Sequence, residues 1–329
     1  MNGRERFEAF FRGEGYMDRL PVYEWAPWWG DTVAAWEKEG LPPRIDLTEY
    51  WKMDRDWHPW MPVRGMDCPN EKTFGGGIIE TEEDYENIRK YLYTDDALAW
   101  VERGVKEYVQ DKSDLPLWIT LEGFFWFPRT LLGIENHLYA FYDDPDLILK
   151  INRDLCEYHK KCLEIVYSYA TPIFMTFCED MSYNNGPMLS REMYNRFMLP
   201  FYNELIPILK SHGTKVMIDT DGDVEPLIPW FLDAGIEGVL PLERMAGVDV
   251  NRVHEMYPDF YMIGGFDKTV LHRGEEAIRA EFERLLPAIK SGRYLPSIDH
   301  QTPPDASLEN YACYRRLLEE YAVKYGARE

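Results

Sequence analysis

The chain has 329 residues, of which 45% are hydrophobic, so its length and apolar content suit one large domain or two of average size. Asp and Glu number 58 against 36 Lys and Arg, which gives a formal net charge of −22. Such an acidic surface repels phosphate backbones and anionic lipid, and it therefore argues against nucleic-acid binding and membrane-surface binding.

Cysteine usage and the N-terminal residues indicate the compartment. The five cysteines form an odd set with no CxxC pair, which is typical of reduced thiols and not of a disulfide framework. The N-terminus lacks the apolar core of a signal peptide, and no later stretch approaches the ~18 apolar residues of a membrane-spanning helix. We expect a cytoplasmic protein.

The N-terminal part of the chain is rich in tryptophan. Eight of the eleven tryptophans fall in the first hundred residues: Trp25, Trp28, Trp29, Trp36, Trp51, Trp57, Trp60 and Trp100. Leu20–Glu24 is the first expected strand, and an eighth strand of the fold is placed in the irregular region Pro62–Ile79. A helix over Glu82–Asp111 precedes an expected strand at Leu117–Leu121, and a second helix covers Asp144–Tyr169.

The second half repeats a short apolar run, a polar corner and an amphipathic stretch, which is the pattern of βα units. The expected strands are Pro172–Phe177, Lys215–Asp219, Gly238–Leu242, Tyr261–Gly264 and Tyr294–Ile298. The helices that follow them are Ser190–Lys210, one from about Val224, one from about Asp249, Glu275–Lys290 and Leu308–Tyr325. A doubly wound open sheet is the alternative, but the GxGxxG fingerprint is absent.

This pattern predicts an α/β fold of the TIM (β/α)8 barrel class, formed by one domain over residues 1–329. Residues 1–115 are expected to contribute an aromatic-rich N-terminal elaboration over the barrel mouth. In such a barrel, catalytic groups project from the carboxyl ends of the strands.

Nearly every expected strand ends in a carboxylate or an imidazole. So many like charges at one mouth need protons, basic side chains or a cation for compensation. Asp221, Glu243 and His300, with Asp219 as a fourth candidate, are residue types that zinc accepts, and we predict a metal site there. A calcium loop starting at Asp219 is excluded, because its twelfth position would be Trp230.

The tryptophans near the first strand suit an aromatic ligand. Flat amphipathic rings line pockets efficiently, and we predict that Trp25, Trp28, Trp29 and Trp57 hold a substrate ring. The alternative, which is compatible with the first, is that these rings cover the barrel mouth and form a homodimer contact.

Several motifs occur in the order typical of one family. These are SREMYNRFMLPFYNELIPILKSHGTKVMIDTDGDVEPLIPWFLDAGIEGVLPLE, IGGFDK and DHQTPPDASLEN between about Ser190 and Tyr311, together with the opening RERFEAFFRGEGYMDRLPV. The chain closely resembles the uroporphyrinogen decarboxylase superfamily over most of its length. The resemblance implies a TIM barrel, and the superfamily contains both porphyrinogen decarboxylases and zinc- and corrinoid-dependent methyltransferases.

Two departures narrow what the resemblance implies. Porphyrinogen decarboxylases carry an arginine-rich segment after the first strand, where this chain has the aromatic and acidic segment Tyr23–Trp29, which would repel a polycarboxylate. The coenzyme M methyltransferases have His-x-Cys-Gly and a distal Cys as zinc ligands. Here those places hold Asp219-Thr-Asp221-Gly222 and His300, harder ligands that suit an oxygen-bound methyl group better than a thiol.

The chain therefore looks most like the substrate-demethylating methyltransferases of O-demethylase systems. The resemblance implies that a methoxylated, aromatic substrate gives its methyl group to the Co(I) corrinoid (cobalamin) of a separate corrinoid-binding protein. Zinc would stabilise the leaving phenolate, and Asp180, Glu24 or Tyr183 would orient a hydroxyl and return a proton. The alternative is a decarboxylase of a small aromatic or pyrrolic acid that needs no metal and no corrinoid partner.

Overall fold

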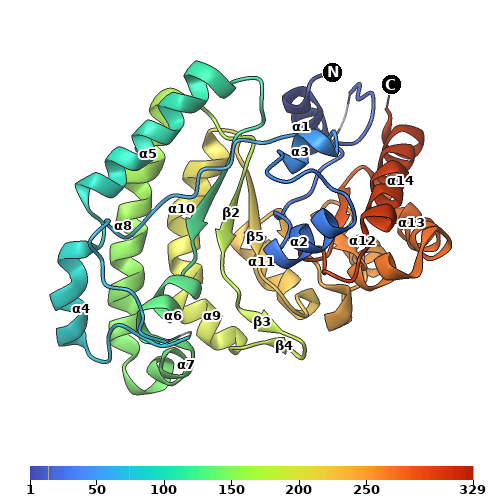
Figure 1. Ribbon diagram of the computed structural model, residues 1–329. Helices are drawn as coiled ribbons and strands as arrows, with labels where there is room; N and C mark the ends of the chain where they lie inside the picture. Colours follow the sequence, from blue (N-terminus) through green and yellow to red (C-terminus); the bar gives the residue numbers. More distant parts are fainter. Residues whose placement is uncertain (14, 74, 329) are drawn as a thin grey trace.

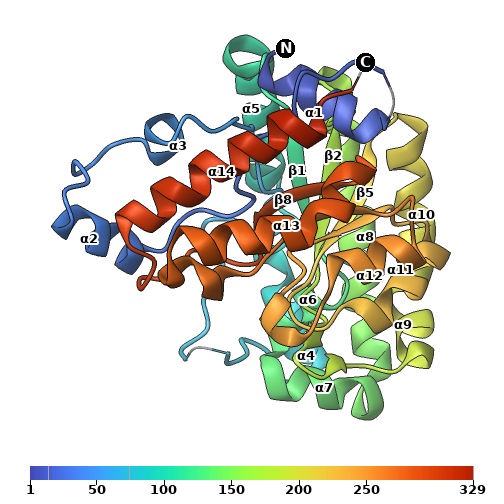
Figure 2. The ribbon, with the colours of Figure 1, turned by 90° about the vertical axis from the view of Figure 1, so that its right-hand side faces the viewer.

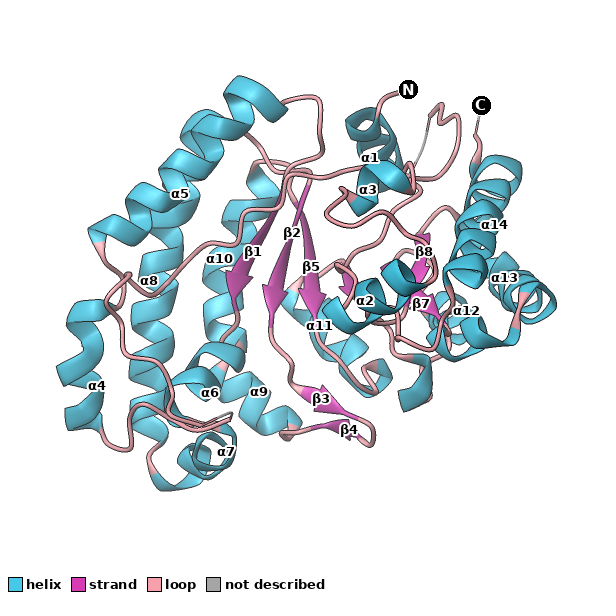
Figure 3. Ribbon diagram, in the orientation of Figure 1, coloured by secondary structure: helices cyan, strands magenta, loops and turns pink. Residues whose placement is uncertain are grey.

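A six-stranded parallel sheet forms the centre of the computed structural model, which describes residues 1–13, 15–73 and 75–328 (Figure 3). The strand order is β1-β2-β5-β6-β7-β8, so neighbours in the sheet follow one another along the chain. The strands are β1 (Trp118–Glu122), β2 (Phe174–Cys178), β5 (Lys215–Asp219), β6 (Gly238–Leu240), β7 (Tyr261–Phe266) and β8 (Tyr294–Ile298). A separate hairpin joins β3 (Ser182–Tyr183) to β4 (Gly186–Pro187).

The strands form where the sequence has short, nearly continuous apolar runs. Every residue of β2, β7 and β8 is buried, as expected for parallel strands covered on both faces. The boundaries expected for β5 and β8 agree with the structure, and those of the other four differ by at most two residues. A parallel α/β fold is thus confirmed.

Helices flank the sheet (Figures 1 and 3). The α-helices are α1 (Gly3–Arg12), α2 (Gly30–Lys38), α3 (Leu47–Tyr50), α4 (Glu82–Ile88), α5 (Asp95–Glu107), α6 (Trp126–Leu132), α7 (Ile134–Asp143), α8 (Pro145–Tyr169), α9 (Arg191–Phe197), α10 (Leu199–Ser211), α11 (Ile228–Ala234), α12 (Val250–Met256), α13 (Glu275–Ser291) and α14 (Leu308–Gly326). Short 3-10 or π turns are η1 (Arg89–Tyr91), η2 (Tyr108–Lys112), η3 (Glu225–Leu227), η4 (Arg244–Ala246) and η5 (Lys268–Arg273).

Two of the expected helices are interrupted. Ser190–Lys210 forms two helices, α9 and α10, because Pro200 has no N–H to continue the ladder past Met198. Glu82–Asp111 breaks at Leu92, which pairs with Arg64, and Thr94 then caps the start of α5.

The prediction of eight strands was wrong in two places within the described residues. Leu20–Glu24 is not a strand, since Leu20 donates to the carbonyl of Ala322 in α14 and Val22 donates to the Asp54 carboxylate. Pro62–Ile79, apart from residue 74, which lies outside the described residues, is also irregular and pairs antiparallel with Leu92 through Arg64. Closure of the sheet into a barrel is therefore not detected.

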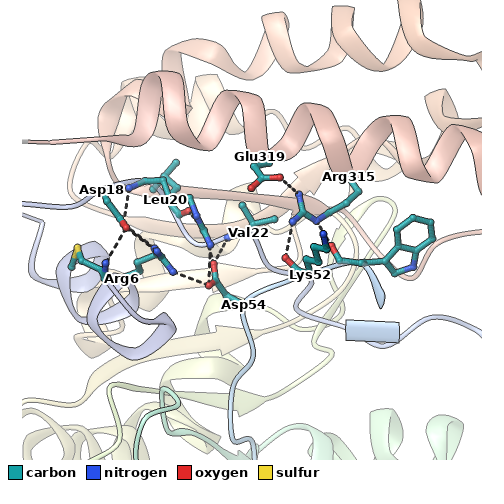
Figure 4. A network of polar contacts seen from close by, with 11 residues as sticks. Arg6, Asp18, Leu20, Val22, Lys52, Asp54, Arg315 and Glu319 are labelled. Carbon is teal, nitrogen blue, oxygen red and sulfur yellow. Dashed lines mark hydrogen bonds and ion pairs between the residues drawn. The ribbon is translucent and has the colours of Figure 1, made fainter. Parts of the chain in front are cut away.

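A polar network fixes the N-terminal segment against the rest of the fold (Figure 4). Arg6 of α1 forms ion pairs with Asp18 at 2.7 Å and Asp54 at 3.1 Å, and Arg19 reaches the same Asp54 at 2.6 Å. Arg315 of α14 donates to the backbone oxygens of residues 51 and 52 at 2.5 and 2.6 Å. These bonds anchor the segment that carries the tryptophans.

The chain ends lie close together, at the end of the molecule away from the strand arrowheads (Figures 1 and 2). Met17 and Arg328 pair through two backbone hydrogen bonds there. The opposite end, where β1, β2 and β5 terminate, faces α6, α7, α9 and the β3–β4 hairpin. Among the described helices, none combines the length and the apolar character needed to cross a bilayer.

Candidate functional site

The candidate site lies at the carboxyl ends of β5, β6 and β8. Asp219 is the last residue of β5 and Asp221 follows two positions later. Glu243 comes shortly after β6, and His300 lies two residues beyond β8. Because the three strands belong to one parallel sheet, their carboxyl ends point to the same end of the fold (Figure 3).

Three of these side chains form a group that could hold a metal ion. One ligand atom from each of Asp221, Glu243 and His300 lies within 4.8 Å of the other two. Two carboxylates and one imidazole are a donor set that zinc accepts, with a fourth position free for substrate. Asp219 is outside this group of three. Burial and the charges of Asp180 and Asp221 raise the pKa of its carboxyl well above the usual range.

The loop that carries Asp221 depends on a glycine. Gly222 has φ of +82°, and a Cβ atom there would lie 2.5 Å from the Cα of Tyr183. Its N–H donates to Oε2 of Glu243 at 2.9 Å, while the other oxygen of that carboxylate lies toward Lys268. Asp180 and Leu242 also have positive φ, of 43° and 62°, a conformation that is costly outside glycine and frequent at functional sites.

Lys268 is the basic side chain that adjoins the group. Its Nζ lies 3.6 Å from Oε1 of Glu243 and 3.4 Å from Oδ1 of the buried Asp299. Asp299 also accepts from the backbone N–H of Arg244, and burial raises its pKa to about 6. Hydrogen bonding to Asp221 raises the pKa of His300. Lys268 and His300 therefore compensate part of the negative charge of the neighbouring carboxylates.

Two of the four predicted ring-binding tryptophans lie beside the metal-binding group. The ring centroids of Trp25 and Trp29 are 6.2 and 6.0 Å from that of His300, both in edge-on arrangements. The indole Nε1 of Trp25 donates to the backbone oxygen of Ile298 at 2.8 Å. Trp29 is 40% exposed, so part of this residue is open to a ligand.

The other two tryptophans lie farther from this group. Trp28 packs edge-on against Tyr311 at 6.0 Å, and Trp57 donates from its indole nitrogen to the carbonyl of Gly104. Together with Trp25 they line a cavity of about 350 Å³ between residues 23–28 and 53–58.

The three predicted proton-handling residues occupy different environments. Asp180 lies next to the group, with Oδ1 3.5 Å from the N–H of Asp221, and burial raises its pKa to about 6. Glu24 accepts hydrogen bonds from Ser297, Ile298 and Tyr314, and burial raises its pKa to about 7. The side chain of Tyr183 is 48% exposed on the β3–β4 hairpin. Of the three carboxyl and hydroxyl groups, that of Asp180 is the one with a hydrogen bond to Asp221 among the described contacts.

Sequence reasoning missed two features at the neighbouring strands. Glu179 accepts from the backbone N–H groups of Phe124, Phe125 and Trp126 and from the hydroxyl of Tyr202, so it joins β2 to the start of α6. Glu122, the last residue of β1, lines a separate cavity. Glu122 directly follows the expected strand Leu117–Leu121, so the strand-end rule that selected Glu243 and His300 could have found it as well.

A second group with metal-ligand residue types lies on helices, at Cys156, Glu157 and Glu204. Arg153 and Lys160 both form ion pairs with Glu204 at 2.7 Å. Since two cations already neutralise these acids, the strand-end group is the better candidate for a metal.

Comparison with known proteins identifies one family. A model of the uroporphyrinogen decarboxylase (URO-D) family matches residues 74–321, well over half of the chain. No curated protein matches the chain.

Two solved structures show distant likeness. One, assigned as a vitamin B12-independent methionine synthase from Listeria monocytogenes, has 12% identity and a TM-score of 0.46 over 93% of this chain and 98% of that one. The other, a chitobiase from Flavobacterium johnsoniae, has 12% identity and a TM-score of 0.37 over 94% and 52% of the two chains. Neither likeness is close enough to support a functional argument.

Proposed function

The chain belongs to the uroporphyrinogen decarboxylase family, and from that premise we propose that it is a zinc-dependent methyltransferase. It would move a methyl group from a methoxylated aromatic substrate to the Co(I) corrinoid of a partner protein. The observation that carries this proposal is the group formed by Asp221, Glu243 and His300, with the rings of Trp25 and Trp29 beside its imidazole.

The donor set suits an oxygen substrate. Carboxylate and imidazole ligands leave zinc a stronger Lewis acid than thiolates do, and a zinc ion held here would supply polarisation of an ether oxygen. The fourth position stays open because Asp219 is not part of the group.

The protein side chains would orient the substrate and move its proton. The part-exposed Trp29 and the neighbouring Trp25 would hold the aromatic ring against the metal-binding group. On cleavage of the C–O bond the oxygen would keep the electron pair of that bond, and a reduced corrinoid would supply the electron pair that binds the methyl group. Burial raises the pKa of Asp180 to about 6, so it would keep a protonated fraction closer to neutral pH than an ordinary aspartate does, and it would deliver that proton to the oxygen.

We assign the other two proton-handling candidates supporting roles. The hydrogen bonds of Glu24 to Ser297, Ile298 and Tyr314 would fix the tryptophan segment against β8. The backbone of Tyr183, whose oxygen accepts from Asp223, would shape the loop around Gly222.

The same proposal includes a closed (β/α)8 barrel. Trp57 and Trp60 form parallel bridges to Leu117 and Thr120 beside β1, and Asp54 donates to the carbonyl of Val22. Residues 20–25 and 54–61 would thus take the places of the two missing strands, between β8 and β1. The tryptophan segment would then emerge at the barrel mouth.

The corrinoid must come from a second protein that covers the mouth. With a net charge of −22, this chain would favour a partner whose docking face is basic.

Elemental analysis of the purified protein and a Co(I)-cobalamin methylation assay with a panel of methoxyarenes test the proposal together. We expect about one zinc per chain and formation of methylcobalamin with at least one methoxyarene. A metal-free protein that transfers no methyl group would refute it.

One observation favours a second candidate, a metal-free decarboxylase of a small aromatic or pyrrolic acid. Lys268 already lies within 4 Å of Glu243 and Asp299, and an ammonium group could bind the substrate carboxylate in place of a metal. Release of CO2 from aromatic acids by chelator-treated protein would favour this candidate.

A further inference from the structure

A second cavity lies at the carboxyl end of β1, separate from the cavity that Trp25 lines. Its volume is about 370 Å³, within the range of roughly 300–1,000 Å³ that small-molecule sites occupy. The residues that matter for its chemistry are Arg64, Glu122, Trp126, Arg129 and Thr130. The cavity adjoins the beginning of α6.

Two half-buried guanidinium groups line this cavity and hydrogen-bond to neutral oxygens. Arg64 donates to the backbone oxygen and hydroxyl of Thr130 at 3.0 and 2.8 Å. Arg129 donates to the backbone oxygen of Asp180 at 3.1 Å and lies over the ring of Trp126, 5.1 Å from its centroid. Among the described residues, neither arginine has a carboxylate within ion-pair distance.

Neither guanidinium forms an ion pair among the described residues, although Arg64 acts on the nearby carboxyl of Glu122 and Arg129 on that of Asp180. Burial of a charged group without an ion-pair partner is costly. The chain has 58 acidic residues against 36 basic ones, so carboxylates that could pair with these two arginines are numerous. Glu71, the other acid that lines the cavity, has an exposed side chain. An anionic ligand would satisfy both guanidinium groups, since arginine binds carboxylates in a fork geometry.

Glu122 adds a hydrogen-bonding group of a complementary kind. Its Oε2 atom is buried without a hydrogen-bond partner among the described residues. Burial raises the pKa of this carboxyl to about 7, so near neutral pH it still holds a proton that it can donate to a bound anion. The indole of Trp126 supplies an aromatic wall beside it.

The cavity lies close to the metal-binding group. Glu122, Cys178 and Asp219 are register partners on the neighbouring strands β1, β2 and β5. Two strand spacings therefore separate the backbones of Glu122 and Asp219, about 10 Å, comparable to the length of one substituted aromatic ring. Arg129 also contacts the backbone of Asp180, whose carboxylate lies beside the N–H of Asp221.

We propose that this cavity is a subsite for the carboxylate of the substrate, held by Arg64 and Arg129, while the methoxy group of the same molecule lies at Asp221, Glu243 and His300. The inference rests on the proposed function and narrows its substrate class to methoxylated aromatic acids. The carboxylate stays on the product, because only the ether bond breaks.

Calorimetric titration of the full chain with 4-methoxybenzoate and with 4-methoxybenzyl alcohol tests the subsite. We expect the acid to bind more tightly than the alcohol. Arg64→Gln should weaken binding of the acid by about tenfold or more, because charged hydrogen bonds are lost, and leave the alcohol within about twofold. Arg64→Lys should retain part of the preference, and Arg129→Gln should reproduce the loss if the Arg64 variants do not fold.

Arg103→Gln is the matched control, since Arg103 is exposed on α5 over the ring of Trp100. It should change neither affinity. Equal affinity of the wild-type protein for acid and alcohol, or equal weakening of both by Arg64→Gln, would overturn the subsite. Tighter binding of the alcohol in the presence of acetate would also overturn the subsite, because the cavity would then bind an anion that is separate from the substrate.

Two measurements separate this inference from the proposed function. Titration of chelator-treated protein with the acid and the alcohol reports on the subsite, and the methyl-transfer assay of metal-loaded protein reports on the reaction. Selective binding of the acid without methyl transfer by metal-loaded protein would leave the subsite standing and refute the methyltransferase. Methyl transfer that prefers the neutral alcohol would do the reverse.

Discussion

The Nε2 atom of His300 lies 3.7 Å from Oδ2 of Asp221, and the rings of Trp25 and Trp29 stand edge-on to the same imidazole. One side chain from the end of β8 thus contacts both the acidic group and the aromatic pair. Substitutions around this imidazole can therefore separate metal binding from binding of the substrate ring.

Replacement of His300 by alanine should remove the bound zinc and abolish methyl transfer while the fold persists. The imidazole is the single nitrogen donor of the group, and two carboxylates alone hold zinc poorly. Elemental analysis, far-UV circular dichroism and the cobalamin assay give the three readouts. His272→Ala removes an exposed imidazole from η5 and should keep zinc and activity. Full zinc content in His300→Ala would show that zinc binds at a different site.

Replacement of Trp29 by alanine should weaken binding of an aromatic ether with no change in zinc content. An aromatic contact contributes about 0.5–1.5 kcal/mol, so the expected rise in the dissociation constant is about two- to tenfold. Titration of the metal-loaded protein with a methoxyarene measures it. Trp100→Ala, which removes another exposed indole from α5, should leave the affinity unchanged. An unaltered dissociation constant in Trp29→Ala would place the ring elsewhere.

Replacement of Gly123 by alanine should destabilise the protein. A Cβ atom there would overlap the Glu179 carboxyl and the backbone oxygen of Cys178, and overpacking of this kind costs about 1–3 kcal/mol. Urea unfolding measures the free energy change. Gly30→Ala is the matched control, because nothing lies within 4 Å of its Cβ position and alanine suits the start of α2. If the two variants were equally stable, Glu179 would not be held as tightly as its four hydrogen bonds suggest.

Glu24 should make the protein less stable as the pH rises. Burial raises its pKa to about 7 from an ordinary value of 4.5, so the unfolded chain loses this proton at lower pH than the folded protein. The stabilisation is complete below about pH 4.5 and is lost as the pH approaches 7. Because Glu24→Gln cannot ionise, its free energy of unfolding should fall less over this interval than that of the wild type. Urea unfolding between pH 5 and 8 measures the difference.

The control for this pH dependence is Glu135→Gln, which changes an exposed acid in the first turn of α7. Its stability should follow the wild-type curve across the interval. Parallel curves for Glu24→Gln and the wild type would contradict the buried, protonated state of Glu24.

The sequence predicts a strand correctly where the segment forms its hydrogen bonds within the sheet, and incorrectly where its partners lie outside the sheet. Lys215–Asp219 and Tyr294–Ile298 pair within the sheet, and their apolar runs predict both boundaries. Leu20–Glu24 has the same apolar character, but its N–H groups bond to Ala322 and Asp54. These partners are remote in sequence, and periodicity contains no information about them.

The same distinction applies to the site. Strand-end position was enough to select Asp221, Glu243 and His300, which the structure brings together. It could not separate them from Asp219, because the turn at Gly222 that sets the place of Asp221 cannot be read from strand-end position alone. Arg64 and Arg129 carry no sequence pattern that marks them, since their shared cavity depends on how residues 62–73 and 75–79 lie against α6.

The hydrogen bond from Trp25 to Ile298 has an evolutionary consequence. It ties a predicted ring-binding residue to the backbone two positions before His300, so the two proposed roles share one piece of structure. Substitutions at Trp25 that accommodate a new substrate would also shift the imidazole, and their effects should not add to those of changes at His300. Within this architecture, new substrates would be acquired more readily through Trp29, which has no such tether among its described contacts.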